Sequence, residues 1–162
     1  MNMTTKPEIC THSEPFYLVG YPFEAAPGKT LTERAAYWQG LKFPAFDAAE
    51  VEKIGSDGAE IGVWTHEGDH DRYVFGYVVP AVGYVPETMR AVTIPGGDFA
   101  VFRAPAHQST AELGENLRAT WRYACDDWLP GSAYEVDSAR MAFEHYSGSD
   151  AAVYIPVRGR AK

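Results

Sequence analysis

The sequence predicts an α+β domain in which a strand–helix–strand–strand unit occurs twice, with an antiparallel sheet and two helices packed on one side of it. One reason is that strand-like and helix-like segments follow one another in the same order in both halves of the chain. Another is that 162 residues, 46% of them hydrophobic, are enough to bury one substantial core. We therefore expect a single domain, with its core over roughly residues 10–157 and a ligand cleft between its halves.

The first unit begins with an extended segment over residues 7–23. A helix is expected from Thr30, a suitable N-cap with a glutamate three residues later, and it ends at Pro44. Apolar side chains recur on one face of this helix at helical spacing. Two β-like runs, residues 60–65 and 72–79, complete the unit.

The second half repeats this order. A long extended region bends at Pro95-Gly96-Gly97, and a tryptophan-rich helix follows over about residues 109–127. We expect the helix to break at Leu129-Pro130-Gly131, because proline and glycine both disfavour a helix interior. Two strands, residues 141–146 and 151–157, complete the chain.

Charge narrows the class of partner. The chain has 22 Asp and Glu residues against 14 Lys and Arg, which gives a net charge of -8. A nucleic-acid-binding surface normally carries a clustered excess of the opposite sign, so we expect no direct binding to nucleic acid. The acidity is compatible with a cationic ligand. Aromatic residues make up 14% of the chain, and some of them are expected to line a cavity.

The sequence shows no sign of export or of a membrane span. Residues 1–12 lack the basic start and apolar run of a signal peptide. No apolar stretch approaches the roughly 20 residues that cross a bilayer. Cys10 and Cys125 are far apart and read as free thiols, with Cys125 expected to be buried and unreactive. We expect a cytoplasmic protein.

Glu144 is the candidate that the closing strands single out. It lies in Phe143-Glu144-His145-Tyr146, where period-two alternation puts Glu144 and Tyr146 on one face of the strand. A buried carboxylate needs a partner or a cationic ligand, and neighbouring aromatic faces also favour a cation. Two alternatives stay open at this point: an exposed glutamate on an edge strand, or a glutamate paired with an arginine such as Arg140.

Aromatic residues on both predicted helices and on the strands are candidates to stack against such a ligand. Large rigid rings supply contact area, although core packing is the alternative for each of them. The main candidates are Trp38, Tyr73, Trp121 and Tyr146. Phe46 and Phe75 are weaker candidates. Three further phenylalanines are assigned to the core: Phe99, Phe102 and Phe143.

One segment imitates a zinc-protease motif. His66-Glu67-Gly68-Asp69-His70 matches the letters HExxH, whose chemistry needs both histidines one turn apart on a helix. Gly68 and Asp69 disfavour a helix, and β-like runs flank the segment on both sides. We interpret it as a hairpin turn, and we expect neither a metal nor another cofactor.

Several short stretches occur in an order and spacing that together are typical of one family. They are Tyr17-Leu18-Val19-Gly20, Ile61-Gly62-Val63, Phe75-Gly76-Tyr77-Val78-Val79, Ile94-Pro95-Gly96-Gly97-Asp98-Phe99-Ala100-Val101-Phe102, Trp128-Leu129-Pro130, Phe143-Glu144-His145-Tyr146 and Tyr154-Ile155-Pro156-Val157. With them the chain resembles the gyrase-inhibitor-like (GyrI-like) small-molecule-binding family, whose domain also forms the effector-binding half of AraC-type and MerR-type regulators. The likeness covers roughly residues 10–157.

The resemblance implies a duplicated strand–helix–strand–strand fold and a pocket between its halves for hydrophobic, often cationic aromatic compounds. An acidic residue carries charge recognition in that family, and Glu144 is the position that matches it. Because no helix-turn-helix precedes the domain in this sequence, a stand-alone member is expected.

Three functions follow as hypotheses. The leading one is a non-enzymatic binder of a flat, hydrophobic, cationic aromatic compound. The second, by resemblance, is a hydrolase of strained cyclopropane-bearing genotoxins, in which Glu144 activates water and a phenol such as Tyr73 or Tyr146 donates to the developing charge. The third is an interaction protein whose acidic surface acts on a partner such as DNA gyrase. The sequence leaves the ligand, turnover and the oligomeric state open.

Overall fold

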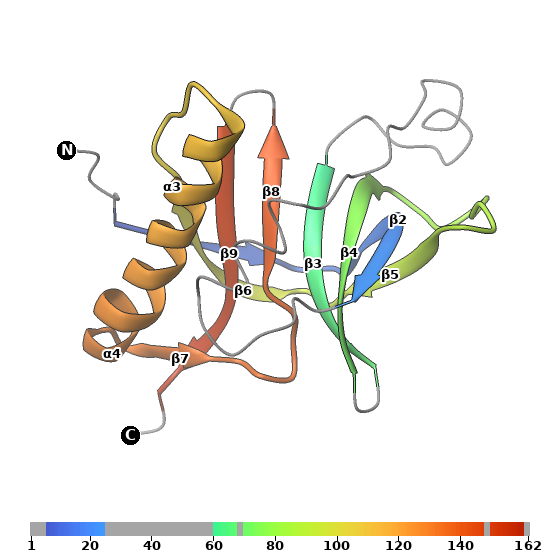
Figure 1. Cartoon of the computed structure of the whole chain (residues 1–162). Helices are drawn as coiled ribbons and strands as arrows, with labels where there is room; N and C mark the ends of the chain where they lie inside the picture. The colour runs from blue at the N-terminus through green and yellow to red at the C-terminus, as the bar shows by residue number, and fades with distance from the viewer. Residues whose placement is uncertain (1–5, 25–59, 68–69, 148–149, 161–162) are drawn as a thin grey trace.

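A single antiparallel sheet with a helix on one side carries the fold (Figure 1). The computed structural model describes residues 6–24, 60–67, 70–147 and 150–160. The predicted α+β class is confirmed. In chain order the elements are β1 (Glu8–His12), β2 (Phe16–Glu24), β3 (Glu60–Glu67), β4 (His70–Val79), β5 (Arg90–Ile94), β6 (Gly97–Arg103), α3 (Thr110–Arg122), the π-helical η1 (Tyr123–Trp128), α4 (Leu129–Gly131), β7 (Tyr134–Val136), β8 (Phe143–Ser147) and β9 (Asp150–Gly159).

The strand order shows the duplication. It is β1-β6-β9-β8-β3-β4-β2-β5, with β7 pairing with β9 outside this path. Two hairpins, β3–β4 and β8–β9, lie side by side and join through β3 and β8 at the centre of the sheet. The strands of both predicted units are therefore present, and the second unit is complete with α3. The helix predicted from Thr30 to Pro44 lies outside the described residues.

Two short connections curl the sheet. β5 and β6 are separated only by Pro95 and Gly96, yet they lie towards opposite ends of the sheet. β1 and β2 also lie towards opposite ends, although only residues 13–15 separate them. Since β1 pairs with β6 and β2 pairs with β5, residues 8–20 and 90–101 form one long antiparallel ribbon. At its bend, residues 13–15 oppose only Pro95 and Gly96, and an unmatched residue of this kind kinks a strand pair. The predicted bend is confirmed.

Both faces of the curled sheet are packed. One face buries the larger cluster, which includes Leu18, Ile61, Val63, Val74, Ile94, Phe99 and Phe143. The other face is covered by α3 (Figure 1). There Leu117 of α3 and Leu129 of α4 cluster with side chains of β6 and β9. Phe99, Phe102 and Phe143 are all buried, as predicted. Successive residues of β8 therefore point alternately to the first cluster, as Phe143 does, and to the helix side, as Tyr146 does.

The helix begins as predicted and ends later than predicted. The Ser109 hydroxyl caps it by accepting from the Glu112 amide at 3.1 Å. The chain then stays helical through η1 and α4 to Gly131, so the expected break at Leu129 is wrong. The Leu129 amide bonds to the carbonyl of Ala124, five residues back, and Pro130 opens the next turn, where its missing N–H leaves no helical bond unmade. Cys125 is free, as predicted, but exposed, because it lies on the outward side of the π turn.

The HExxH-like segment is a hairpin. His66 and Glu67 end β3, His70 begins β4, and Glu67 pairs with His70 across the turn. Two antiparallel strands cannot place the two histidines one helical turn apart on a common face. The hairpin interpretation is confirmed. Within the described ranges, none of the helices is both long and apolar enough to cross a membrane.

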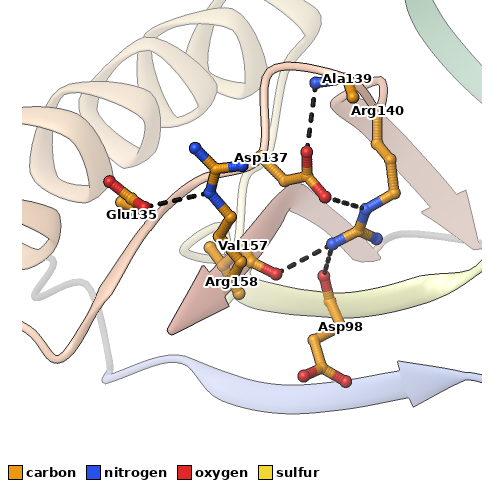
Figure 2. Close-up of polar contacts among 7 residues, drawn as sticks. All are labelled: Asp98, Glu135, Asp137, Ala139, Arg140, Val157 and Arg158. Carbon is orange, nitrogen blue, oxygen red and sulfur yellow. Dashed lines mark hydrogen bonds and ion pairs between the residues drawn. The ribbon is translucent and has the colours of Figure 1, made fainter. Parts of the chain in front are cut away.

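Arg140 forms hydrogen bonds at the position where the strand paired with β9 changes from β6 to β7 (Figure 2). β9 pairs with β6 as far as Pro156 and with β7 from Val157 onwards. There the Arg140 guanidinium donates to the carbonyl oxygens of Asp98 at 2.7 Å and Val157 at 2.9 Å.

The same guanidinium has two further contacts. It donates to the Asp137 carboxylate at 2.9 Å, and this contact holds the pKa of Asp137 below its usual value. It also lies over the Phe99 ring, 5.0 Å from its centroid. Gly97, with φ +136°, leaves room for it, because a Cβ there would lie 2.5 Å from Nη1 of Arg140. Arg140 therefore belongs to the scaffold.

Candidate ligand-binding site

Glu144 is a buried carboxylate near the centre of the sheet. Its strand, β8, lies between β9 and β3, and the residue is only 7% exposed. Phe143, one position earlier, packs into the core cluster on the other face, as the alternation predicts. Arg140 binds Asp137 and two backbone carbonyls instead of Glu144. Both alternatives that the sequence left open, an edge-strand glutamate and an Arg140 pair, are excluded.

Three neutral donors hold the two oxygens of Glu144. The indole N–H of Trp121, from α3, donates to Oε2 at 3.0 Å. The hydroxyl of Tyr146, two residues along β8, donates to Oε1 at 3.0 Å, and that of Tyr73, from β4, contacts the same oxygen at 3.5 Å. No lysine, arginine or histidine of the described part of the chain forms an ion pair with this carboxylate. Among the described residues, its negative charge is solvated by dipoles alone.

The protonation states follow from burial. Burial raises the pKa of Glu144 above its usual value, while the hydrogen bonds from Trp121, Tyr146 and Tyr73 oppose that rise. Burial, and then the negative charge beside each phenol, raises the pKa of Tyr73 and of Tyr146 well above the usual value. Both phenols therefore keep their protons at neutral pH and remain hydrogen-bond donors. The indole and the two phenols thus offset part of the free energy that burial of the Glu144 charge costs.

Five aromatic rings form a chain that begins and ends at Glu144, and we call them the aromatic circle. Their centroids lie 5.8 Å apart for Tyr146–Phe75, 6.5 Å for Phe75–Tyr73, 4.8 Å for Tyr73–Trp64 and 5.3 Å for Trp64–Trp121. Tyr73 is buried, whereas the other four rings are partly exposed. Partly exposed rings around a buried carboxylate offer apolar contact area that a ligand can cover.

Most of the predicted site residues come together here. Tyr73, Trp121, Tyr146 and the weaker candidate Phe75 all lie around Glu144, although they come from three elements. Trp38 and Phe46 lie outside the described residues, and their part in a site remains a prediction.

Sequence reasoning missed three residues of β3: Glu60, Gly62 and Trp64. In register, Gly62 lies opposite Glu144, and Glu60 lies opposite Tyr146. The Glu60 charge adds to burial in raising the pKa of Tyr77 and of Tyr146, so a second carboxylate lies at the rim of the aromatic circle. A glycine inside a strand, two positions from a tryptophan, was an available signal of a close approach. The partner that approaches it could not be read from the sequence.

The raised pKa of Glu144 predicts how stability changes with pH. A carboxyl whose pKa is raised by folding favours the native state below its unfolded pKa, near the usual value of 4.5, and loses that contribution as pH rises through the folded value. We therefore expect Glu144→Gln, which cannot ionise, to gain free energy of unfolding over the parent protein as pH rises across this window. Urea denaturation of both proteins at several pH values measures the difference. A difference that is constant with pH would contradict the prediction.

Comparison with protein families places the chain in the GyrI-like class of effector-binding proteins. The chain belongs to the Cass2 family, described as integron-associated effector binding proteins, because the family model matches residues 14–157. The resemblance drawn from the sequence is confirmed, and effector binding is the activity that the family description states. No protein of curated function matches the chain in sequence.

Solved structures of similar fold come from bacteria and from mobile DNA. SAV2435, in a structure titled as bound to tetraphenylphosphonium, has a TM-score of 0.65 at 16% identity, with 96% of this chain and 95% of that chain covered. A candidate bacterial transcription regulation protein from Staphylococcus aureus MU50 has a TM-score of 0.62 at 14% identity, with 96% and 99% covered. The integron cassette protein VCH_CASS2, from the mobile metagenome of Vibrio cholerae, has a TM-score of 0.55 at 13% identity, with 96% of this chain and 97% of that chain covered. At these identities the likeness extends to the fold alone.

Proposed function

We propose that this protein binds flat, hydrophobic, cationic aromatic compounds without transforming them, with Glu144 recognising the charge and the aromatic circle contacting the ring faces. The observation that carries the proposal is the state of Glu144, which is 7% exposed, accepts three neutral hydrogen bonds and has no cationic partner among the described residues. Removing an ionised carboxylate from water is unfavourable, and neutral donors offset only part of that free energy. A ligand cation supplies the missing compensation.

The surroundings of Glu144 favour an aromatic cation over a small inorganic one. Each ring face that a cation approaches contributes about 0.5–2 kcal/mol, more as water is excluded. Trp64 and Trp121, the strongest ring type for this contact, lie edge to face at 88°, and Trp121 donates to Oε2 of the carboxylate. Phe75 and Tyr146 also lie edge to face, and Tyr146 donates to Oε1. Glu60 adds negative potential at the rim. A protein of the same fold, SAV2435, is titled as bound to tetraphenylphosphonium, which is an aromatic cation and supports the proposal.

A matched pair of ligands tests the role of charge. Ethidium is a flat aromatic cation, and phenanthridine is its uncharged parent ring at pH 7.5. We expect ethidium at 100 times its dissociation constant to stabilise the fold by about 2.7 kcal/mol, which raises the melting temperature by roughly 5–10 °C. Phenanthridine at the same concentration should give a much smaller shift. Thermal denaturation with each compound, and calorimetry for the dissociation constants, measure both effects.

Two outcomes contradict the proposal. If phenanthridine binds as tightly as ethidium, charge is not recognised and Glu144 has no part in selectivity. If chromatography after long incubation recovers ethidium chemically changed, the protein is an enzyme and not a simple binder. A series that includes tetraphenylphosphonium then separates shape from charge, because this cation is bulky where ethidium is flat.

A further inference from the structure

Gly62 occupies the one position of β3 that lies between Glu144 and Phe75. In register it is opposite Glu144 of β8 on one side and opposite Phe75 of β4 on the other. A Cβ built on Gly62 would lie 1.8 Å from the hydroxyl oxygen of Tyr73 and 2.4 Å from Cζ of that ring. The nearest atoms to the missing side chain therefore all belong to Tyr73, and the phenol occupies the space that any other residue at position 62 would fill.

The strand order explains why this space is needed. Tyr73 is on β4 and Glu144 is on β8, with β3 between them. Neighbouring strands lie about 4.7–4.9 Å apart, so the phenol has to cross the whole width of β3 to contact the carboxylate. Directly opposite Tyr73 on β3 is Trp64, whose ring lies against that of Tyr73 at 4.8 Å. The remaining route passes diagonally over position 62, and a side chain there would block it.

We propose that Gly62 is a positioning residue of the ligand site: its bare backbone seats the Tyr73 ring so that the phenol donates to Glu144. This inference rests on the proposed function, in which Glu144 binds the cation. With a methyl group at position 62, Tyr73 has to rotate away, and Glu144 loses one of the three donors that favour its ionised form. The displaced ring also moves relative to Trp64 and Phe75, its two neighbours in the aromatic circle.

Gly62→Ala, with Gly83→Ala as its control, tests this role. Gly83 lies in the loop before β5, and a Cβ there meets nothing within 4 Å. We expect Gly62→Ala to weaken ethidium binding by about two- to tenfold, which corresponds to the loss of one hydrogen bond. Gly83→Ala should bind like the parent protein. Equal affinity for the two alanine variants would overturn the inference.

A titration separates positioning from a general disturbance of the fold. The indole N–H of Trp121 donates to Glu144, so its resonance in a nitrogen–proton correlation spectrum follows the ionisation of that carboxyl. Gly62→Ala and Tyr73→Phe should both raise the apparent pKa of Glu144, because each removes the same donor, whereas Gly83→Ala should leave it unchanged. An unchanged midpoint in Gly62→Ala would show that Tyr73 keeps its position and would refute the proposal.

If Gly62→Ala does not fold, the same substitution can be tested in a Tyr73→Ala variant, where the smaller side chain leaves room for it. In Tyr73→Ala the three atoms nearest to a Cβ at position 62 are gone, so adding Gly62→Ala should change neither the melting temperature nor the ethidium affinity further. A further loss in the double variant would mean that the backbone, and not Tyr73, requires glycine. If Glu144→Gln leaves cation binding intact, the proposed function fails, while the Trp121 titration still decides the role of Gly62.

Discussion

Replacing Glu144 with glutamine is expected to weaken the binding of ethidium about 30- to 700-fold. The substitution removes one member of a buried, hydrogen-bonded charge pair, a change that typically raises the free energy of binding by about 2–4 kcal/mol. Glutamine keeps the shape of the side chain, and its carbonyl can still accept from the Trp121 indole. Calorimetry at neutral pH measures the loss. Binding of phenanthridine should change little, because an uncharged ring gains nothing from the carboxylate.

The same variant separates a binding defect from a folding defect. Because Glu144 is buried without a cation among the described residues, neutralising it should leave the free energy of unfolding unchanged or raise it. Lower affinity with undiminished stability is not what a damaged fold produces. Glu115→Gln, an exposed change of equal charge on α3, is the control for long-range electrostatics. A loss of comparable size in that control would assign the effect to net charge.

Replacing Arg140 with alanine is expected to lower the free energy of unfolding by about 3 kcal/mol and the melting temperature by roughly 6–12 °C. The guanidinium joins three acceptors from β6, β9 and the segment that leads to β8, and each of them loses a charged donor (Figure 2). Chemical denaturation measures the change. Arg140→Lys should recover only part of it, because one ammonium group cannot match the planar fork of the guanidinium.

Cation binding should survive this loss of stability. Arg140 lies over Phe99, which belongs to the core cluster on the face of the sheet opposite Glu144. Arg103→Ala, an exposed change of the same charge on β6, controls for the removal of a positive group. Should Arg140→Ala weaken ethidium binding as strongly as Glu144→Gln, the two faces of the sheet would be coupled, contrary to this assignment.

Local patterns in the sequence were sufficient to predict most of the strands and the second helix, and to predict on which face of a strand each side chain lies. Alternation in β8 placed Glu144 and Tyr146 together on the face opposite Phe143, as the two core clusters show. Gly68 and Asp69 were enough to reject a zinc helix in favour of a hairpin. The end of the helix was missed, because a π turn shifts the hydrogen bonds by one residue and lets Pro130 follow without an unmade bond.

The site residues and strands that the sequence did not predict depend on contacts between distant segments of the chain. Trp64, Gly62 and Glu60 entered the site only because β3 pairs with β8, about 80 residues further along the chain, and no local pattern specifies that register. The same pairing explains why Tyr73 reaches Glu144 across a glycine. The three-residue strand β7 was beyond reach for a similar reason, since so short a strand depends on its partner more than on its own propensity. β1 lies inside the extended segment predicted over residues 7–23, but the sequence did not show that it separates from β2 at residues 13–15.

The ribbon formed by residues 8–20 and 90–101 affects how the protein behaves in concentrated solution. Among the described strands it supplies the two outermost of the sheet, β1 and β5, and each is only five residues long. Unpaired outer strands are where foreign chains add and fibres start, and the hazard grows with the length of flat backbone on offer. The described part of this sheet therefore offers neighbouring molecules only short outer strands on which to add.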